Sequence, residues 1–440
     1  MNEIERRDAA GTRRHDGDAT DASSPVPAVP ALLAALVFLV ALNLRPAIAA
    51  VGPVLARIGD DLGWGEGVLG VLGAMPLWAF AAVSPLVRFV TRRLGVDRTI
   101  LVALLVLAAG DLVRSFGGPT GVWLGTFAVG AGIAAGNVLV PVIAKRDYAR
   151  HVALAAGVYS GCITAGSAIA GLTSAWLATS LGGWRPSLAV WAVPALAVAV
   201  LWSVRVAWGS RNGRGPRGVK GAVSGAVAPM GRPPAPASGP VPAETSHPRP
   251  LWRRPMTWWV TLFMGLQSAA FYTMSNWLPS LVSAAGFTET QAGVQLFVFQ
   301  SLGILSGLLI PALMHVRGNQ VCAALAASAP MAVAGIGWLA APAASPLWSV
   351  VGGMGQGASL VVAFTLISLR GRTPEETVAL SGMAQSIGYL VASVGPLAFG
   401  ALAEWSGAWT APLVLFTALA FGQCVVAVLA GDARRPSDDA

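Results

Sequence analysis

Long runs of apolar residues recur along almost the whole chain, and short polar gaps separate them. An α-helix needs about 20 residues to cross the hydrocarbon core of a bilayer. The runs and their breaks predict twelve such helices, at residues 31–56, 68–87, 99–116, 121–144, 152–178, 187–208, 256–284, 292–314, 320–341, 346–369, 378–402 and 410–431. The pattern therefore predicts an all-α integral membrane protein.

The positions of the basic residues test this count, because Lys and Arg concentrate in the cytoplasmic loops of membrane proteins. Basic residues lie before the first run, in every second gap after it and in the C-terminal tail, for example Arg6, Arg88, Arg92, Arg93, Arg98, Lys145, Arg146, Arg211, Arg254, Arg317, Arg370 and Arg434. The other gaps hold few cations, with Arg57, Arg114 and Arg185 as exceptions. The alternation supports twelve spans and predicts that the N- and C-termini are both cytoplasmic.

One long gap divides the predicted spans into two groups of six. Residues 209–255 are basic and rich in Gly, Pro and Ala, which predicts a disordered cytoplasmic linker. The linker separates an N-terminal six-helix half (31–208) from a C-terminal half (256–431). Polar composition predicts disordered tails at 1–30 and 432–440. The first tail lacks the apolar stretch and cleavage site of a secretory signal, so the first helix is expected to direct insertion.

Composition excludes most soluble classes of protein. The chain is 55% hydrophobic and 11% charged, whereas soluble domains carry about 25% charged residues. The net charge of +9 resides in the gaps between apolar runs and not on a basic stripe, so no nucleic-acid partner is expected. Cys162, Cys322 and Cys424 lie far apart, so neither a metal site nor a disulfide framework is expected. The expected location is the cell (plasma or inner) membrane, as a multi-pass protein.

Ionisable side chains are costly inside hydrocarbon and usually serve a function there. Arg45, in the sequence Leu-Asn-Leu-Arg-Pro, is the one clear case in the centre of a predicted span. At about 1.5 Å rise per residue it lies roughly 20 Å from either end of its predicted helix. Pro46 also leaves a backbone carbonyl one turn earlier without its donor. Arg45 is either a contact for an anionic or polar ligand, the favoured interpretation, or a structural residue bonded to carbonyls.

No carboxylate is predicted at mid-span. Asp111 is interpreted as lying near the outer end of its span, in a local ion pair with Arg114 three residues later. A buried cation without a buried anion suggests that an anionic or strongly polar ligand supplies the counter-charge. A proton is the candidate coupling ion of any transport, although no mid-span carboxylate is evident to carry it.

Neutral polar residues recur near the middle of several spans and are costly to bury unpaired. Ser381, Gln385, Tyr389 and Ser393 follow one another at intervals of four residues, so they share one helix face. Candidate residues for a binding cavity are Arg45, Asn43, Asn137, Gln267, Tyr272, Asn276, Gln356, Gln385 and Tyr389. Asn43 and Arg45 are two residues apart and point in nearly opposite directions, so only one is expected to face the cavity.

Four stretches of sequence carry a family resemblance. They are Leu-Asn-Leu-Arg-Pro-Ala-Ile-Ala-Ala-Val-Gly-Pro from Leu42, Gly-Ile-Ala-Ala-Gly-Asn-Val-Leu-Val-Pro from Gly132, Gln-Ser-Ala-Ala-Phe-Tyr-Thr-Met-Ser-Asn-Trp-Leu-Pro from Gln267, and Ser-Gly-Met-Ala-Gln-Ser-Ile-Gly-Tyr from Ser381. Together they resemble the cyanate and 2-nitroimidazole transporter family (CynX/NimT) of the major facilitator superfamily. They fall on spans 1, 4, 7 and 11, so the resemblance covers the whole membrane body.

The resemblance implies the major facilitator fold, with a binding site between the two halves near the bilayer midplane. It implies a secondary transporter of small anionic or polar compounds, such as cyanate-like anions or nitroimidazole-like molecules. By this resemblance the pocket residues would be Arg45, Asn137, Gln267, Tyr272, Gln385 and Tyr389. The protein is expected to act as a monomer, with a small-molecule solute and the lipid bilayer as its partners, and without a cofactor.

Two departures from superfamily patterns are visible. Between spans 2 and 3, Arg88 and Arg92 occupy the positions of a usual Gly and Asp, followed by Asp97. This puts the usual Asp-mediated clasp of the cytoplasmic gate in question. Span 5 also lacks the Gly-Pro of drug antiporters, which disfavours a multidrug exporter.

Three other functions are alternatives to the transport of a small polar or anionic solute, whose direction the sequence leaves open. An exporter of drugs or metabolites is the alternative within transport. A membrane enzyme would need a nucleophile and base or metal ligands at one depth, and none of the four His lies mid-span. A channel would need a ring of repeated polar or charged residues. No catalytic residue is therefore expected.

Overall fold

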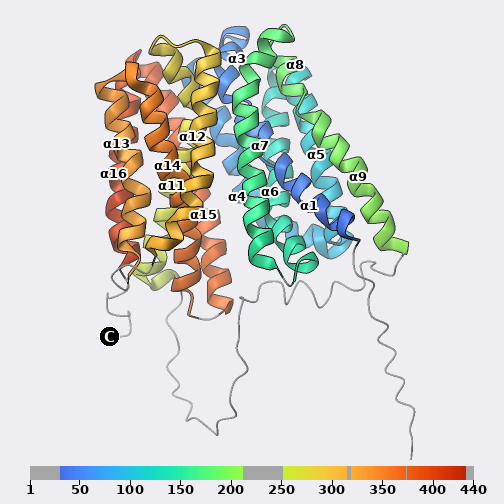
Figure 1. The fold of residues 1–440 in the computed structure, drawn as a ribbon. Coiled ribbons are helices and arrows are strands. Elements are labelled where there is room, and N and C mark those ends of the chain that lie inside the picture. The colour runs from blue at the N-terminus through green and yellow to red at the C-terminus, as the bar shows by residue number, and fades with distance from the viewer. Residues whose placement is uncertain (1–29, 150, 212–250, 315–318, 373, 433–440) are drawn as a thin grey trace, which may run out of the picture.

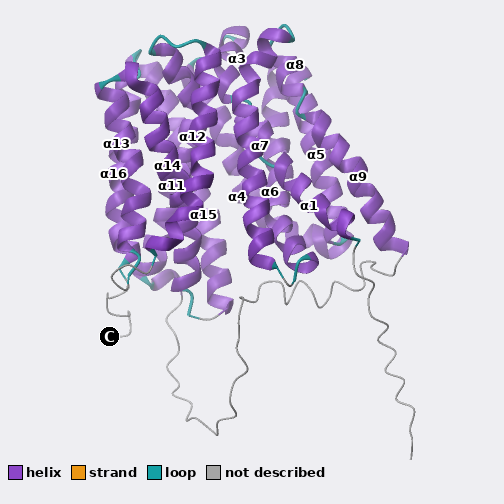
Figure 2. Cartoon of the chain, in the orientation of Figure 1, coloured by secondary structure: helices purple, strands orange, loops and turns teal. Residues whose placement is uncertain are grey.

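Helices joined by short loops make up the structure, a computed structural model that describes residues 30–149, 151–211, 251–314, 319–372 and 374–432. No strand occurs within these ranges (Figure 2). The first group of helices is α1 (Ala31–Asn43), α2 (Pro46–Ala49), η1 (Gly52–Val54), α3 (Leu55–Leu62), α4 (Glu66–Leu94), α5 (Val96–Phe116), α6 (Gly118–Asp147), α7 (Val152–Ser180), α8 (Trp184–Ala189) and α9 (Ala192–Arg211). The second group is η3 (Leu251–Arg253), α11 (Pro255–Ala284), α12 (Glu289–Leu309), η4 (Ile310–Leu313), α13 (Val321–Ala340), η6 (Pro342–Ala344), α14 (Ser345–Arg370), α15 (Pro374–Ser406) and α16 (Thr410–Gly431).

Most of the predicted linker and tails fall outside the described residues. At the linker's two edges, the described chain is more ordered than predicted. α9 continues to Arg211, and the short helix η3 begins at Leu251, so both edges of the predicted 209–255 segment are helical. The reason is that a helix that crosses a membrane can continue into water for a turn, beyond its apolar run.

Eleven segments of the described chain are long and apolar enough to cross a membrane, judged by length and composition. They correspond to eleven of the twelve predicted spans. The remaining span is α11, a helix of 30 residues whose polar side chains lower its hydropathy. Gln267, Tyr272 and Asn276 are among its many buried residues. Because neighbouring helices bury these polar side chains, α11 can cross the membrane within the bundle although its surface is not apolar on every side.

The two groups of helices lie side by side (Figure 1). α1 begins and α9 and α16 end at the same end of the bundle, the lower end in Figure 1. This end carries many of the cations of the helices and is called the basic end below; it includes Arg92, Arg93, Arg146, Arg205, Arg254 and Arg370. The other end, with α3 and α8, is called the opposite end.

We expect the basic end to face the cytoplasm, because Lys and Arg are retained on that side during insertion. A reporter domain fused after Ala440 should then resist protease added to intact cells and be cut only after the cells are opened. Cleavage in intact cells, with a cytosolic control protein left whole, would show that the chain has the reverse orientation.

The first predicted span, at 31–56, corresponds to the apolar segment Ala31–Leu62, but it is not one continuous helix. The chain crosses in four pieces, α1, α2, η1 and α3, and reaches Leu62. The physical cause is Pro46 and Pro53, which lack the N–H that a continuous helix needs. The sixth span is also in two pieces, α8 and α9. Arg45 consequently lies at the break after α1, as the residue that precedes α2, and not in the middle of an unbroken helix.

Glycines allow the two halves to approach each other toward the opposite end. A Cβ atom on Gly52 of η1 would lie 2.3 Å from the carbonyl oxygen of Ser275 on α11. A Cβ atom on Gly400 of α15 would lie 2.3 Å from the carbonyl oxygen of Glu66 on α4. Backbone meets backbone at both points, so a larger residue at either glycine would force the halves apart.

Polar bonds join the halves at the same end. Arg57 of α3 forms an ion pair with Glu289 at the start of α12. Glu404, near the end of α15, accepts a hydrogen bond of 2.6 Å from the backbone N–H of Gly67 on α4. These bonds lie at exposed positions, where single ion pairs stabilise weakly, so the glycine contacts are the tighter constraint on closure.

α7 and α15 are less enclosed toward the basic end. No residue of α7 from 156 to 165 is buried, whereas Ser167, Ala168 and Ala170 nearer the opposite end are buried. A Cβ atom added to Gly161 of α7, or to Gly382 of α15, would meet nothing within 4 Å. The halves are thus packed closely at the opposite end and more openly along these two helices at the basic end.

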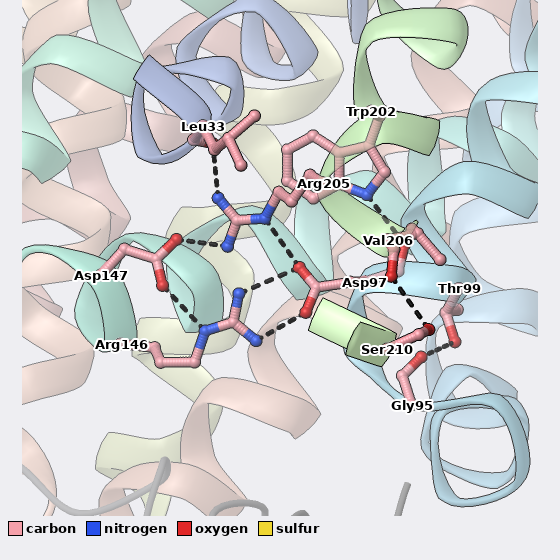
Figure 3. Close-up of polar contacts among 10 residues, drawn as sticks. All are labelled: Leu33, Gly95, Asp97, Thr99, Arg146, Asp147, Trp202, Arg205, Val206 and Ser210. Carbon is pink, nitrogen blue, oxygen red and sulfur yellow. Dashed lines mark hydrogen bonds and ion pairs between the residues drawn. The ribbon is translucent and has the colours of Figure 1, made fainter. Parts of the chain in front are cut away.

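A cluster of charges ties the first group of helices together at the basic end (Figure 3). Asp97 of α5 accepts two hydrogen bonds of 2.9 Å from Arg146 of α6 and one of 2.9 Å from Arg205 of α9. Arg205 also donates to the Leu33 carbonyl of α1 at 2.7 Å and pairs with Asp147. Asp97 thus joins α5 to α6 and α9 within this half, while the departure at Arg88 and Arg92 concerns the clasp of the cytoplasmic gate and stays a prediction.

The three cations that interrupted the alternation of charge are all paired with carboxylates. The pairs are Arg57 with Glu289, Arg114 with Asp111, and Arg185 with Asp61. Pairing lowers the net positive charge of each site, which explains how these arginines occur outside the basic end.

Candidate functional site

The break after α1 positions Arg45. Pro46 has no N–H to donate to the carbonyl of Leu42 four residues earlier, and Leu44 turns back to donate to Ala41 at 3.2 Å. Gly166 of α7 covers the freed carbonyl, since a Cβ atom there would lie 2.1 Å from the Leu42 oxygen. The lack of a side chain at Gly166 therefore lets α7 pack directly on the broken turn.

Arg45 reaches from the first half to the second. Its Nη1 donates a hydrogen bond of 2.8 Å to the hydroxyl of Tyr272 on α11. Its guanidinium carbon lies 5.4 Å from the ring centre of Tyr272 and 5.6 Å from that of Phe271, within the range of cation–π attraction. Arg45 itself is only partly buried, while its Nε has no hydrogen-bond partner in the described structure.

Aromatic rings from both halves surround this arginine. Phe80 of α4 meets Tyr272 edge to face with ring centres 6.3 Å apart, and meets Tyr389 of α15 at 5.4 Å. Phe80 and Tyr272 are buried, whereas Tyr389 and Phe271 keep some exposed surface. The structure thus brings three predicted site residues (Arg45, Tyr272 and Tyr389) together in one aromatic, cationic region.

Two of the predicted glutamines bond to each other. Gln356 of α14 donates from Nε2 to Oε1 of Gln267 on α11 at 3.4 Å. Gln267 in turn donates to the Ser268 hydroxyl at 2.7 Å, and both glutamines are buried. A third, Gln385 of α15, donates to Ser381 at 2.9 Å and is half-buried, which leaves it more accessible than the other two.

The three predicted asparagines occupy different surroundings. Asn43 is buried and donates to the Leu39 carbonyl of its own helix at 2.9 Å, so Arg45 is the one of this pair that reaches across to the other half. Asn276 is buried with its Nδ2 unpartnered in the described structure, against Gly73 of α4, where a Cβ atom would lie 2.1 Å from that nitrogen. Asn137 of α6 is half-buried.

Arg45 is not the one ionisable side chain that the helices enclose, and the enclosure of a second pair was not predicted. Asp111 and Arg114 of α5 form an ion pair of 2.6 Å, with side chains 0% and 2% exposed. Arg114 also donates to the carbonyl of Ala47 at 2.7 Å, next to the break that carries Arg45. The predicted pairing near the end of the span is confirmed, but the complete enclosure of the pair was missed because the end of the apolar run was taken as the end of the buried region. Arg114 had been visible in the sequence as an exception to the charge alternation.

Phe80 and Phe271 were also missed as neighbours of Arg45. They are ordinary apolar residues in apolar runs, and only the tertiary contacts distinguish them from other phenylalanines. Phe271 does lie beside Tyr272 in the third family stretch, which could have drawn attention to it, whereas nothing in the sequence singled out Phe80.

Replacing Gly166 with alanine is expected to disturb the site through the break. The new Cβ atom would overlap the Leu42 carbonyl, and overpacking of this kind costs about 1–3 kcal/mol. α7 would have to move or the turn before Arg45 would have to reshape, so the melting temperature and solute affinity should both fall. Gly157→Ala on the same helix is the matched control, because its Cβ atom would meet nothing within 4 Å. Equal behaviour of the two variants would show that the close contact at Gly166 does not constrain the break.

Comparisons with known proteins agree with the fold. Residues 31–396 match the Major Facilitator Superfamily. A transporter of Bacillus subtilis (strain 168), YycB, described as uncharacterized, is 34% identical over 88% of this chain and 90% of its own length. The 2-nitroimidazole transporter of Escherichia coli (strain K12) is 32% identical over 91% of this chain and 95% of its own. The cyanate transport protein CynX of the same organism is 23% identical over 84% and 89%.

Solved structures share the architecture at low sequence identity. The D-xylose–proton symporter is similar with a TM-score of 0.65 at 13% identity, over 90% of this chain and 96% of that one. This likeness shows the fold alone. Together with the match over residues 31–396, it confirms the predicted all-helical fold, and the 2-nitroimidazole and cyanate relatives confirm the resemblance found in the four sequence stretches. The chain therefore belongs to the major facilitator superfamily, as a multi-pass secondary transporter of the cell membrane related to the 2-nitroimidazole and cyanate transporters, and it is not an enzyme.

Proposed function

We propose that this transporter carries a small planar solute with an anionic or strongly electronegative group, and that Arg45 holds that group. The two halves would rock around the site and expose it to one side of the membrane at a time. In the state described here the opposite end is closed, and the site would open toward the basic end.

The observation that carries the proposal is the incomplete pairing of Arg45. Its hydrogen-bond partner is the neutral hydroxyl of Tyr272, and no acidic side chain of the described residues forms an ion pair with it. A cation at this depth in a membrane protein is expected to find a counter-charge. A partly exposed guanidinium between the two halves can take it from the solute.

The rings near Arg45 favour a planar solute. Phe271 and Tyr389 present partly exposed ring surface, on which a flat molecule can stack while its electronegative group meets the guanidinium. The named substrates of the relatives fit this description, since a nitroimidazole is a flat ring with a nitro group and cyanate is a small anion. Gln385 and Tyr389 would set the orientation of the bound molecule.

Matched pairs of probes test the proposal on purified protein. We expect 2-nitroimidazole to raise the melting temperature more than imidazole, and benzoate to raise it more than benzyl alcohol, because a ligand stabilises the state that it binds by mass action. Cyanate serves as the small-anion probe. If the members of each pair stabilise equally, or if no probe stabilises the protein, recognition of an electronegative group by Arg45 is wrong.

Counterflow in proteoliposomes tests the transport step. Vesicles preloaded with an unlabelled stabilising probe should take up the labelled probe transiently above its equilibrium level, as only a carrier allows. Arg45→Gln vesicles with the same amount of protein are the control, and they should show little uptake.

A further inference from the structure

The ion pair of Asp111 and Arg114 calls for an explanation. Both side chains are fully enclosed, at 0% and 2% exposure, and burying charge is unfavourable unless the geometry is good. The pair is not complete: Oδ2 of Asp111 and Nε of Arg114 have no partner in the described structure. If the ion pair alone set the geometry, Nε of Arg114 and Oδ2 of Asp111 could also bond to each other. Because they do not, a further contact must help to fix the position of the guanidinium.

The other bond of Arg114 identifies that constraint. Its Nη1 donates to the carbonyl of Ala47 in α2 at 2.7 Å. In a regular helix that carbonyl would accept from the N–H of Val51, but Val51 donates to Ile48 at 3.1 Å. The tightened turn therefore leaves the Ala47 carbonyl free, and Arg114 satisfies it.

The surrounding helices hold Arg114 firmly. Gly125 of α6 lies against its backbone, since a Cβ atom there would be 2.3 Å from the Arg114 nitrogen. Asp111 fixes the far side of the guanidinium with a hydrogen bond of 2.6 Å. α5 thus presents a rigid, charged donor to a helix segment of only four residues, α2.

We infer that Arg114, supported by Asp111, is a positioning residue for solute binding, because it sets the broken segment that aims Arg45 at Tyr272. Ala47, the residue that Arg114 grips, is two residues from Arg45 and lies beyond the break. Without the bond, α2 can rotate or shift, and the guanidinium of Arg45 would lose its place between the rings of Phe271 and Tyr272. The inference rests on the role proposed for Arg45, but its structural content can be tested without any solute.

The chain contains four tyrosines, so 3-fluorotyrosine labelling gives a simple fluorine NMR spectrum. Tyr272→Phe assigns the signal of Tyr272, and Arg45→Gln shows how far that signal moves when the guanidinium is removed. The test variant is Asp111→Asn/Arg114→Gln, which leaves no unpaired buried charge. It should move the Tyr272 signal by at least half of the Arg45→Gln shift.

Two controls separate positioning from general loss of structure. Tyr148 packs on Phe38 of α1 with ring centres 5.3 Å apart, so its signal reports α1 itself and should stay in place. Ser115→Ala removes a hydroxyl that bonds only to the backbone carbonyl of Asp111, so it leaves the Asp111 carboxylate and the Arg114 guanidinium in place and should leave the Tyr272 signal unchanged. Arg114→Lys, which keeps the charge but not the forked donor, should give a smaller shift than the double variant.

A Tyr272 signal at its native position in the double variant would overturn the inference, and so would equal movement of the Tyr148 and Tyr272 signals. If the proposed role of Arg45 in solute binding is wrong but the inference about Arg114 is right, the outcome is different. In that case the Tyr272 signal responds as described, while Arg45→Gln leaves the binding of 2-nitroimidazole and benzoate unchanged.

Discussion

Arg45→Gln should lower solute affinity roughly ten- to hundred-fold while the protein remains folded. A hydrogen bond to a charged group contributes about 1.5–3 kcal/mol, and each 1.4 kcal/mol or so changes affinity ten-fold. Arg45→Lys should also be harmful, because one ammonium cannot bond Tyr272 and a solute with the fork that a guanidinium offers. Melting temperature and affinity for the probes that stabilise the native protein are to be measured on the same preparation.

The structural alternative for Arg45 makes the reverse prediction. If Arg45 serves only to join the halves through Tyr272, its loss should lower the melting temperature and leave the affinity of the folded fraction unchanged. Tyr272→Phe is the matched control, because it removes the same bond and keeps the charge. We expect it to weaken binding much less than Arg45→Gln, and equal losses of affinity would favour the joining role.

Gly52→Ala should open the opposite end of the protein and reduce transport strongly. The new Cβ atom would lie 2.3 Å from the Ser275 carbonyl oxygen and 3.1 Å from that of Asn276. Both are backbone atoms of α11, which cannot rotate away as a side chain could. A penalty of about 1–3 kcal/mol on the closed state would shift the balance between closed and open states roughly five- to hundred-fold.

Cysteine labelling measures this shift. Ser275→Cys, in a background with Cys162, Cys322 and Cys424 replaced by alanine, places a thiol at a position that is 2% exposed in the closed state. A membrane-impermeant maleimide added from the opposite end should react several-fold faster in the presence of Gly52→Ala. Gly422→Ala is the control, since its Cβ atom would meet nothing within 4 Å. Unchanged labelling together with unchanged transport would mean that the halves do not close on Gly52.

Glu289→Gln removes the ion pair with Arg57 at the same end and serves as a comparison. Because both side chains are substantially exposed, at 45% and 30%, the pair is expected to contribute at most about 1 kcal/mol. Its effect on labelling should therefore be smaller than that of Gly52→Ala, which acts through packing.

The sequence by itself determined the class of the protein and most of its helices. Many apolar runs long enough to cross a bilayer are not compatible with a soluble fold. The alternation of basic and non-basic gaps also restricts the number of membrane-spanning helices. For this reason the predicted helices coincide with the observed ones to within a few residues over most of the chain, α16 (410–431) being identical. Because polar groups are costly to bury, the sequence also pointed to Arg45, Tyr272 and Tyr389, which the structure places close together around Phe80.

Only the tertiary structure decided how those residues are used. Hydropathy averages over a turn, so it could not show that α1 ends at Asn43 or that Arg114 reaches the Ala47 carbonyl. It also could not distinguish Gln267 and Gln356, which satisfy each other, from Gln385, which keeps accessible surface. Pairing and enclosure depend on which helices meet and at what height. Those contacts join residues that are far apart in the sequence, such as Arg45 and Tyr272. The pattern of residues within one helix cannot predict them.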